Sequence, residues 1–230
     1  MPTAVPTRRE RHRNATLKEI KQVARRLVVD SGPTAISLRA IARELGMSAA
    51  ALYRYFPSLE ALIADVASEI FDELSAAAEA AGRGEGEVDA QLVAMARGFR
   101  RWSIAHPQEF ALLFGTPVPG VAEMEAECAP AEHPGARFGA VFVAPFARFW
   151  AELGRPSGPD DPDLRQRLAP MYAAHGDILP PQAMYQFLIG WIRLYGVVAL
   201  EVFGHLRWAV DDVEPLFEAE LTAFVVGLRA

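Results

Sequence analysis

Residues 37–56 constrain the fold more than any other part of this sequence, because they predict two short helices joined by a tight turn. Ser37 is a typical N-cap residue, and Gly46 fits the left-handed position that ends many helices. Ser48 follows as a second N-cap. The apolar side chains recur at helical spacing, at Leu38, Ile41, Ala42 and Leu45 in the first helix and at Leu52 and Phe56 in the second. The sequence therefore predicts a helix-turn-helix.

The second of these helices has an outer face of small, polar and aromatic residues. Leu52 and Phe56 are expected to be buried against the neighbouring helices. The residues that then face outward are Ala49, Ala50, Tyr53 and Arg54. A short helix of this kind, held in place by its neighbour, has the size and the surface that enter the major groove of DNA. We therefore expect this motif to bind double-stranded DNA.

The same stretch resembles the DNA-binding domain of the TetR/AcrR family of transcriptional repressors. The residues that match the family pattern are Gly32, Ser37, Leu38, Ile41, Ala42, Gly46, Met47, Ser48, Ala50, Leu52, Tyr53, Tyr55, Phe56, Ser58, Glu60 and Leu62. Ala50 stands where the family usually has glycine, and Leu59 stands where it usually has lysine. The resemblance implies a dimeric regulator with an N-terminal DNA-binding domain and a C-terminal domain that binds a small effector.

The resemblance implies that the second helix lies in the major groove with Ala49, Ala50 and Tyr53 facing the bases. Alanine side chains can there touch thymine methyl groups. Arg39 and Arg54 are the candidates for contacts to guanine or phosphate. The hydroxyl groups that can donate to phosphates are those of Ser37, Ser48, Tyr53 and Tyr55. For Tyr55, packing inside the domain is an equally good interpretation.

The charges are distributed unevenly along the 230 residues, whose net charge is -6. Residues 1–63 hold 11 Lys and Arg against 5 Asp and Glu, whereas the remainder holds 12 against 24. A basic N-terminal part on an acidic body indicates that the N-terminal part meets a polyanion. Considered alone, the charge is better explained by a solvated basic face, and it favours a polyanion only in combination with the helix-turn-helix. Residues 1–13, with four arginines, are expected to be disordered, and either to lie along DNA or to act as a solubilising tail.

Other features indicate a cytoplasmic protein. The single cysteine, Cys128, excludes an intramolecular disulfide and fits a reducing compartment. The N-terminus is polar and basic, so no signal peptide is expected. The longest apolar stretch, residues 183–204, contains Gln186, Arg193 and Glu201, which argues against a membrane span. No membrane partner is expected.

Helical periodicity continues through the rest of the chain, without an alternating strand pattern or an internal repeat. The first helix is expected to begin near Thr16, where Thr16 and Glu19 fit a capping box. The glycine-rich residues 82–86 are the clearest domain boundary. Further helices are predicted at residues 88–105, 108–114, 138–153, 164–174, 181–206 and 213–228. The predicted fold is all-α, with a helix-turn-helix domain at residues 14–74 and a helical ligand-binding and dimerisation domain at residues 86–230.

The second domain supplies many aromatic side chains that could line an apolar pocket between helices. The candidates for ligand contact are Trp102, Phe110, Phe146, Trp150, Trp191 and Tyr195, with Tyr172 as a further aromatic residue of this domain. Plain core packing is the alternative for each of them. The spacing Trp191-x-x-x-Tyr195-Gly196-x-x-x-x-Glu201 also resembles the Trp-His-Gly type of TetR effector domain, with tyrosine in place of histidine. The two C-terminal helices are expected to form a four-helix dimer interface.

No catalytic constellation, phosphate-binding loop or metal-ligand cluster stands out in the sequence, so no active site, cofactor or metal is expected. Glu201 and His205 lie one helical turn apart, and an ion pair near the helix end is the preferred interpretation over metal binding. A redox role for Cys128 is a weaker alternative, because no basic residue adjoins it.

These observations predict a homodimeric transcriptional regulator that binds a palindromic operator. The resemblance implies that it is a repressor, released by a small apolar or amphipathic effector. One alternative is an enzyme whose helical body holds a substrate and whose DNA-binding head is regulatory. Another is a non-specific architectural DNA-binding protein, which the acidic body disfavours.

Overall fold

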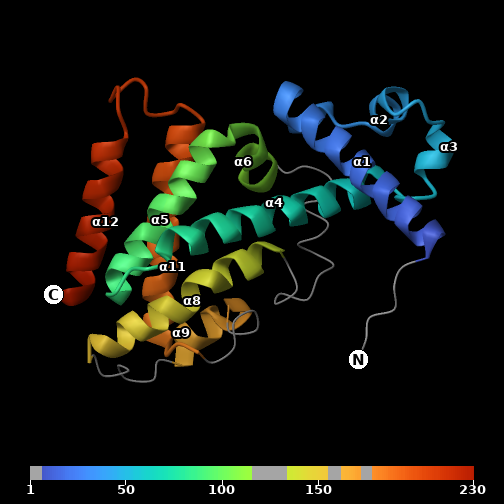
Figure 1. The fold of residues 1–230 in the computed structure, drawn as a ribbon. Coiled ribbons are helices and arrows are strands. Elements are labelled where there is room, and N and C mark those ends of the chain that lie inside the picture. The colour runs from blue at the N-terminus through green and yellow to red at the C-terminus, as the bar shows by residue number, and fades with distance from the viewer. Residues whose placement is uncertain (1–6, 116–133, 155–161, 172–177) are drawn as a thin grey trace. The chain divides into compact units, whose positions relative to one another are not determined.

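The computed structural model describes residues 7–115, 134–154, 162–171 and 178–230, and the regular structure of these residues is helical throughout (Figure 1). The predicted all-α fold is confirmed. The chain divides into two compact units. Unit 1 comprises Met1–Ile70 and Gln108–Ala126, and unit 2 comprises Phe71–Pro107 and Glu127–Ala230.

Unit 1 contains the N-terminal helices. They are α1 (Arg8–Ser31), the short 3-10 helix η1 (Pro33–Ala35), α2 (Leu38–Glu44), α3 (Ala49–Leu52) and the first part of α4 (Leu59–Gly82). Each long helix places one apolar stripe in a common core, as helical periodicity requires. The fully buried side chains of this core include those of Ile20, Ala24, Val28, Ile41, Leu52 and Leu62. The α2–α3 pair therefore packs into this core through its apolar side.

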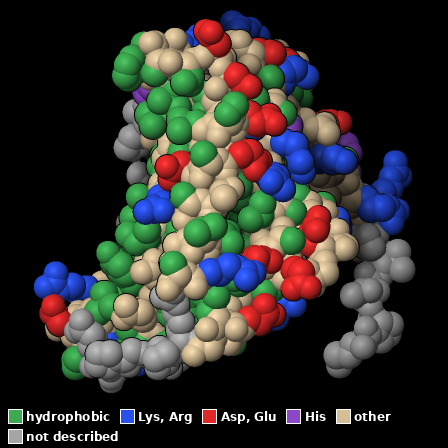
Figure 2. All heavy atoms as spheres, turned by 90° about the vertical axis from the view of Figure 1, so that its left-hand side faces the viewer, with side chains coloured by type: hydrophobic (Ala, Val, Ile, Leu, Met, Phe, Trp, Pro, Cys, Tyr) green, Lys and Arg blue, Asp and Glu red, His purple; other side chains and the backbone are tan. Residues whose placement is uncertain are grey.

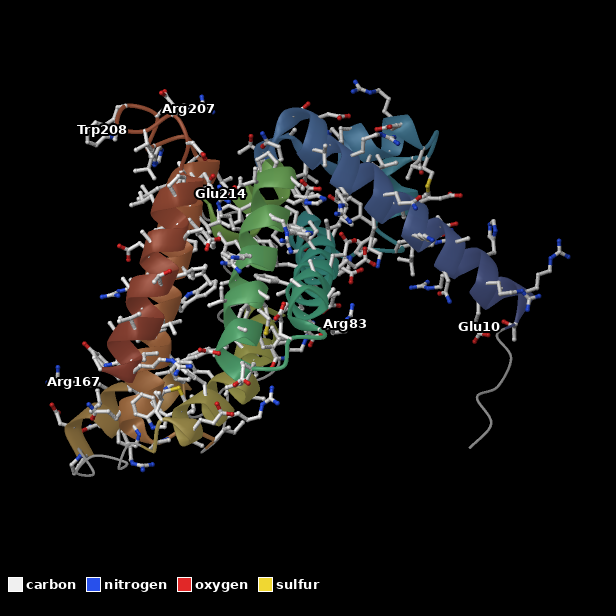
Figure 3. All side chains as sticks on the ribbon, turned by 60° about the vertical axis from the view of Figure 1, so that its left-hand side comes forward. Glu10, Arg83, Arg167, Arg207, Trp208 and Glu214 are labelled. Atoms are coloured by element: carbon white, nitrogen blue, oxygen red, sulfur yellow. The ribbon has the colours of Figure 1, made fainter. Side chains whose placement is uncertain are left out.

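Helix α1 begins at Arg8 rather than near Thr16. The Thr7 hydroxyl accepts a hydrogen bond from the Glu10 N–H at 3.3 Å, and the Glu10 carboxylate accepts one from the Thr7 N–H at 2.6 Å (Figure 3). This capping box, whose backbone bond lowers the pKa of Glu10, starts the helix ahead of the arginines. The prediction that residues 8–13 are disordered is therefore wrong. Thr16 lies inside the helix, where its hydroxyl donates to a carbonyl one turn earlier.

Unit 2 holds the C-terminal helices. They are the second part of α4, α5 (Val88–Ala105), α8 (Pro134–Glu152), α9 (Pro162–Arg167), α11 (Pro181–Val202) and α12 (Glu214–Arg229), while α6 (Pro107–Phe114) falls almost wholly in unit 1. Helix α5 has the bounds that the sequence predicts. Helix α11 ends before residue 206 because Gly204, with a φ of +70°, turns the chain. The His205 N–H then donates to the Leu200 carbonyl at 2.8 Å, as in a Schellman motif.

The core of unit 2 is rich in aromatic side chains. Phe99 of α5, Phe138 of α8 and Trp191 of α11 form a three-way contact, with ring centroids 5.6 to 5.8 Å apart. At another point α11 and α12 approach closely, because a Cβ on Gly190 would lie 2.7 Å from the ring of Phe224. These contacts join α5, α8, α11 and α12 into one packed body.

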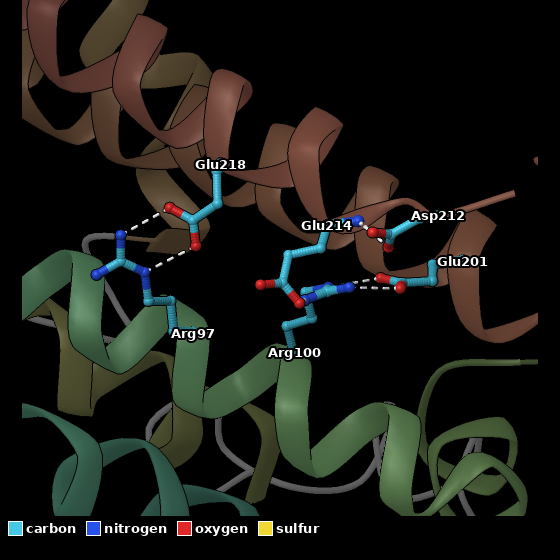
Figure 4. Close-up of polar contacts among 6 residues, drawn as sticks. All are labelled: Arg97, Arg100, Glu201, Asp212, Glu214 and Glu218. Atoms are coloured by element: carbon cyan, nitrogen blue, oxygen red, sulfur yellow. Dashed lines mark hydrogen bonds and ion pairs between the residues drawn. The ribbon is translucent and has the colours of Figure 1, made fainter. Parts of the chain in front are cut away.

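A buried arginine links α5 to the two C-terminal helices (Figure 4). Arg100 is 8% exposed, and its guanidinium donates two hydrogen bonds of 2.7 Å to the Glu201 carboxylate. A third donation, of 3.3 Å, reaches Glu214 at the start of α12. The hydrogen bonds to Glu201 raise the pKa of Arg100. The guanidinium also lies over the ring of Phe217, 5.1 Å from its centroid.

Arg97, one turn earlier on α5, makes a comparable but exposed bidentate pair with Glu218 at 2.8 and 2.6 Å, which lowers the pKa of Glu218. Side-chain exposure is 47% and 36% in this pair, against 10% and 15% for Arg100 and Glu201. Both pairs therefore start from α5 and have bidentate geometry, but the Arg100–Glu201 pair is buried and the Arg97–Glu218 pair is largely exposed.

We expect Arg100→Met to lower the free energy of unfolding by about 3 kcal/mol, because it leaves the Glu201 carboxylate buried without its partner. Arg97→Met removes an exposed pair and is expected to cost less than about 1 kcal/mol. Urea denaturation followed by circular dichroism, at one protein concentration, measures both values. Equal losses of unfolding free energy in the two variants would contradict the view that burial makes the Arg100–Glu201 pair more important than the Arg97–Glu218 pair.

Candidate nucleic-acid interface

The turn between α2 and α3 is fixed by side-chain and backbone hydrogen bonds. The Ser37 hydroxyl accepts from the Ala40 N–H at 3.2 Å and starts α2. Gly46, with a φ of +62°, ends it, and the Met47 N–H donates to the Ala42 carbonyl at 2.9 Å. This is again the Schellman pattern, and it confirms the predicted role of glycine at this position. The two helices are thus held at a defined turn.

Helix α3 is very short and is anchored from one side. The Ser48 hydroxyl accepts from the Ala51 N–H at 3.2 Å, and Leu52 is fully buried. The helix is followed by turns in which the Phe56 N–H still donates to the Leu52 carbonyl at 3.1 Å. Its backbone therefore remains helix-like as far as the buried Phe56.

The outer face of α3 has the composition that the sequence predicts. Ser48, Ala49, Ala50, Tyr53 and Arg54 are all exposed, and the Tyr53 side chain is among the most exposed large apolar groups, at 56%. These five residues lie within two turns of each other, so the fold brings them together on one surface.

Two further candidates lie on neighbouring segments. Arg39, in the first turn of α2, is exposed, whereas Ser37 is partly buried and uses its hydroxyl as a cap acceptor. Neither Arg39 nor Arg54 is in an ion pair with any residue that the structure describes. Both guanidinium groups are therefore available to an external acceptor.

Tyr55 is partly buried, and the Arg13 guanidinium of α1 lies 5.6 Å from its ring centroid. This cation–π contact was not predicted, because the sequence analysis placed Arg13 in a disordered arm. The missed signal was the pair Thr7 and Glu10, which has capping-box spacing and encloses Arg8 and Arg9. Residues 1–6 of the expected arm lie outside the described part of the chain.

Ion pairs join α1 to the neighbouring helices of unit 1. Arg26 of α1 pairs with Glu44 at the end of α2, and Lys21 of α1 lies 3.3 Å from Asp65 of α4. Glu109 of α6 is only 4% exposed and lies 3.5 Å from Arg25 of α1. The carboxylates of Glu44, Asp65 and Glu109 thus have basic partners, and none of these ion pairs uses Arg39 or Arg54.

The six ligand candidates occupy different environments. Trp102 is buried and stacks on His106 with ring centroids 4.6 Å apart, and Phe110 is fully buried in unit 1. Phe146 and Trp150 are buried together in the core of unit 2. Trp191 and Tyr195 are partly exposed and stack on each other at 5.8 Å. Five of the six thus belong to unit 2, and Phe110 belongs to unit 1.

Trp150 has an unusual polar environment. Its indole Nε1 is buried and has no hydrogen-bond acceptor among the residues that the structure describes. The surrounding side chains are those of the apolar cluster that includes Phe146, Leu168, Leu179 and Met184. An unpaired buried donor costs about 1–3 kcal/mol, so an acceptor supplied from outside would be favourable at this point.

The remaining candidates for chemistry are not assembled into a site. Glu201 pairs with Arg100, and the expected Glu201–His205 ion pair is wrong because α11 ends at Val202, before His205. Within the described residues there is no group of three or more His, Cys, Asp or Glu placed to hold a metal ion. Cys128 and Tyr172 lie outside the described residues.

Helix α11 is long and apolar enough to cross a membrane by composition, with a mean hydropathy of 1.4 over its best window. Only 22% of that window is buried within the subunit. Figure 2 shows the side of the molecule that carries α11 and α12, where hydrophobic side chains gather over much of the surface. Much of the apolar surface on this face is therefore not covered within the subunit.

Comparisons with known proteins agree with this geometry. The family described as "Bacterial regulatory proteins, tetR family" matches residues 20–66, and "Tetracyclin repressor-like, C-terminal domain" matches residues 92–224. The HTH-type transcriptional regulators Rv1816 of Mycobacterium tuberculosis and Mb1846 of Mycobacterium bovis are each 29% identical over 222 residues, covering 91% of both chains.

Solved structures show the same relationship. The crystal structure of SCO4313 has a TM-score of 0.72 and 31% identity, covering 95% of this chain and 98% of that one. A Rhodococcus protein of unknown function shares the fold, with a TM-score of 0.61 and 23% identity over the full length of both chains. This chain is a DNA-binding transcriptional regulator and not an enzyme. It belongs to the TetR family.

Proposed function

We propose that this regulator is a cytoplasmic repressor that binds a palindromic operator as a homodimer and is released by a small apolar effector. The observation that supports DNA binding is the exposed face at α3. Two small residues, Ala49 and Ala50, are exposed there together with Tyr53 and Arg54, while Leu52 is fully buried on the opposite side. Small residues allow close approach to base edges, and the flanking arginine and hydroxyl groups suit guanine or phosphate.

The apolar surface of α11 and α12 supports the homodimer. Its most exposed large side chains are those of Tyr185, Ile192, Leu200, Leu216 and Val226. Gly196 faces open space, with no atom within 4 Å of a Cβ placed on it, so another helix could approach closely there. Two copies of this helix pair form a four-helix interface. A two-fold dimer in turn matches a palindromic operator.

The unpaired Trp150 donor supports the effector half of the proposal. An apolar molecule with one hydrogen-bond acceptor would satisfy Nε1 and contact the aromatic side chains around it. Two recognition helices must lie about 34–36 Å apart to occupy successive major grooves. An effector that favours another separation weakens operator binding, with a reciprocal coupling of about 1–3 kcal/mol.

We expect Arg39→Ala and Tyr53→Ala each to weaken operator binding by roughly 1–3 kcal/mol, because each removes a direct contact to base or phosphate. Fluorescence anisotropy with an operator fragment at moderate salt measures the effect. Arg83→Ala is the matched control, since Arg83 is exposed in the turn after α4 and is expected to leave affinity unchanged. Wild-type affinity in both test variants, with native circular dichroism, would reject this docking.

We expect Val226→Glu to convert the dimer into a monomer, because it buries a charge in the centre of the proposed interface. Val226 is 58% exposed in the single subunit, so the substitution itself should not unfold the chain. Val29→Glu provides the same change at an exposed position of α1. Light scattering reports the mass of each variant. A dimer for Val226→Glu would show that another face is used.

We expect Trp150→Phe to change the free energy of unfolding by less than about 1 kcal/mol, because the lost packing is offset by removal of an unpaired donor. Trp102→Phe is the control at similar burial, since no buried unpaired nitrogen is found there among the described residues. It should lose about 1–2 kcal/mol from packing alone. Urea denaturation compares the two. A greater loss for Trp150→Phe would show that its donor is satisfied.

A further inference from the structure

The connection between α11 and α12, residues 203–213, carries the most exposed large apolar side chain that the structure describes. Trp208 is 86% exposed, whereas Trp102 and Trp150 are buried and Trp191 is partly buried. Figure 3 shows Trp208 projecting outward from this connection beside Arg207. A tryptophan with so much apolar surface in water is typical of a binding surface.

Hydrogen bonds order this connection. The His205 N–H donates to the Leu200 carbonyl at 2.8 Å, and the N–H groups of Ala209 and Val210 donate to the Leu206 carbonyl at 2.9 and 3.1 Å. At its end the Asp212 carboxylate accepts from the Glu214 N–H at 3.0 Å. Trp208 therefore stands on a backbone already fixed before binding, which reduces the entropy lost when a partner immobilises it.

Exposed apolar side chains continue from the end of α11 into this connection. Leu200 lies in the last turn of α11, and Phe203 is the residue that caps it, and both are exposed. Leu216, also exposed, begins the same surface on α12. The connection therefore continues the face that the proposed homodimer uses. In a two-fold interface both copies contribute the same residues, so the connection of each subunit would be buried.

The charges on the connection favour a second copy of the chain over a membrane. Arg207 is exposed next to Trp208, and Asp211 and Asp212 are exposed three and four residues further on. Two such segments can pair basic with acidic groups across a two-fold axis. An anionic lipid surface would instead repel the aspartates, and the protein has a net charge of -6.

We propose that Trp208 anchors the dimer by packing against the second copy of the chain, so that the interface extends beyond the helical parts of α11 and α12 into their connection. This inference rests on the proposed function, since it assumes that α11 and α12 form the dimer. Trp208 supplies the aromatic anchor of this extension, and Arg207 with Asp211 supplies polar groups around it.

Sedimentation equilibrium of Trp208→Ala tests the anchor. The dimer dissociation constant should rise at least tenfold, whereas Ile104→Ala, which shortens an exposed apolar side chain of α5, should leave it unchanged. An unchanged dissociation constant for Trp208→Ala overturns the proposal. If Val226→Glu is monomeric in that case, the helical interface stands and only the anchor fails. If Val226→Glu is also a dimer, the proposed face itself is wrong.

Intrinsic fluorescence gives a second readout, and comparison with Trp208→Phe separates exposure of Trp208 from unfolding, which would expose Trp102 and Trp150 in both proteins. Dilution of the wild type through its dissociation constant should shift the emission to longer wavelength and raise the rate of acrylamide quenching, because Trp208 becomes exposed. Trp208→Phe should lack this change when diluted through its own dissociation constant. The same change in Trp208→Phe overturns the proposal. A blue shift of the monomer on addition of phosphatidylglycerol vesicles also overturns it, in favour of a membrane.

Discussion

The DNA-binding surface depends on a helix that cannot be stable by itself. Helix α3 comprises only Ala49–Leu52, and nucleating a single turn is unfavourable in isolation. It persists because Ser48 caps it, because Leu52 is fully buried, and because the turn at Gly46 delivers the chain at the correct angle. Of these groups only Ser48 also belongs to the exposed face. The side chains of Ala49, Ala50, Tyr53 and Arg54 take no part in these interactions, so these four residues can vary with the DNA sequence without loss of the fold.

The body of the protein shows a similar separation. Arg100 of α5 links α11 and α12 through its ion pairs with Glu201 and Glu214. The outer surfaces of α11 and α12 contribute little to that packing, and most residues in the apolar window of α11 are only partly buried or exposed. An apolar surface that the subunit does not need for its own core is typical of an interface. The body can thus fold as a unit and still retain a face for association.

Sequence periodicity and capping residues were sufficient to predict the helices and the outer face of α3, because both depend on local chemistry. The contacts of Arg100 were not predictable, since they join residues 101 and 114 positions apart that only the fold brings together. The start of α1 was missed although its signal was local, because Thr16 and Glu19 offered a second capping box. Phe110 was assigned to the ligand set by residue type alone, and its place in unit 1 follows from tertiary packing.

The proposed dimer and the operator are linked by mass action. If each recognition helix alone binds one half-site weakly, joining two of them makes the second contact intramolecular and raises the affinity for a palindrome without any new contact to DNA. Any group that strengthens association of the subunits, such as Trp208, then also strengthens operator binding at low protein concentration. The reverse holds as well, since an operator that binds the dimer but not the monomer stabilises the dimer. In this proposal the connection between α11 and α12 influences operator binding although it carries none of the proposed DNA contacts.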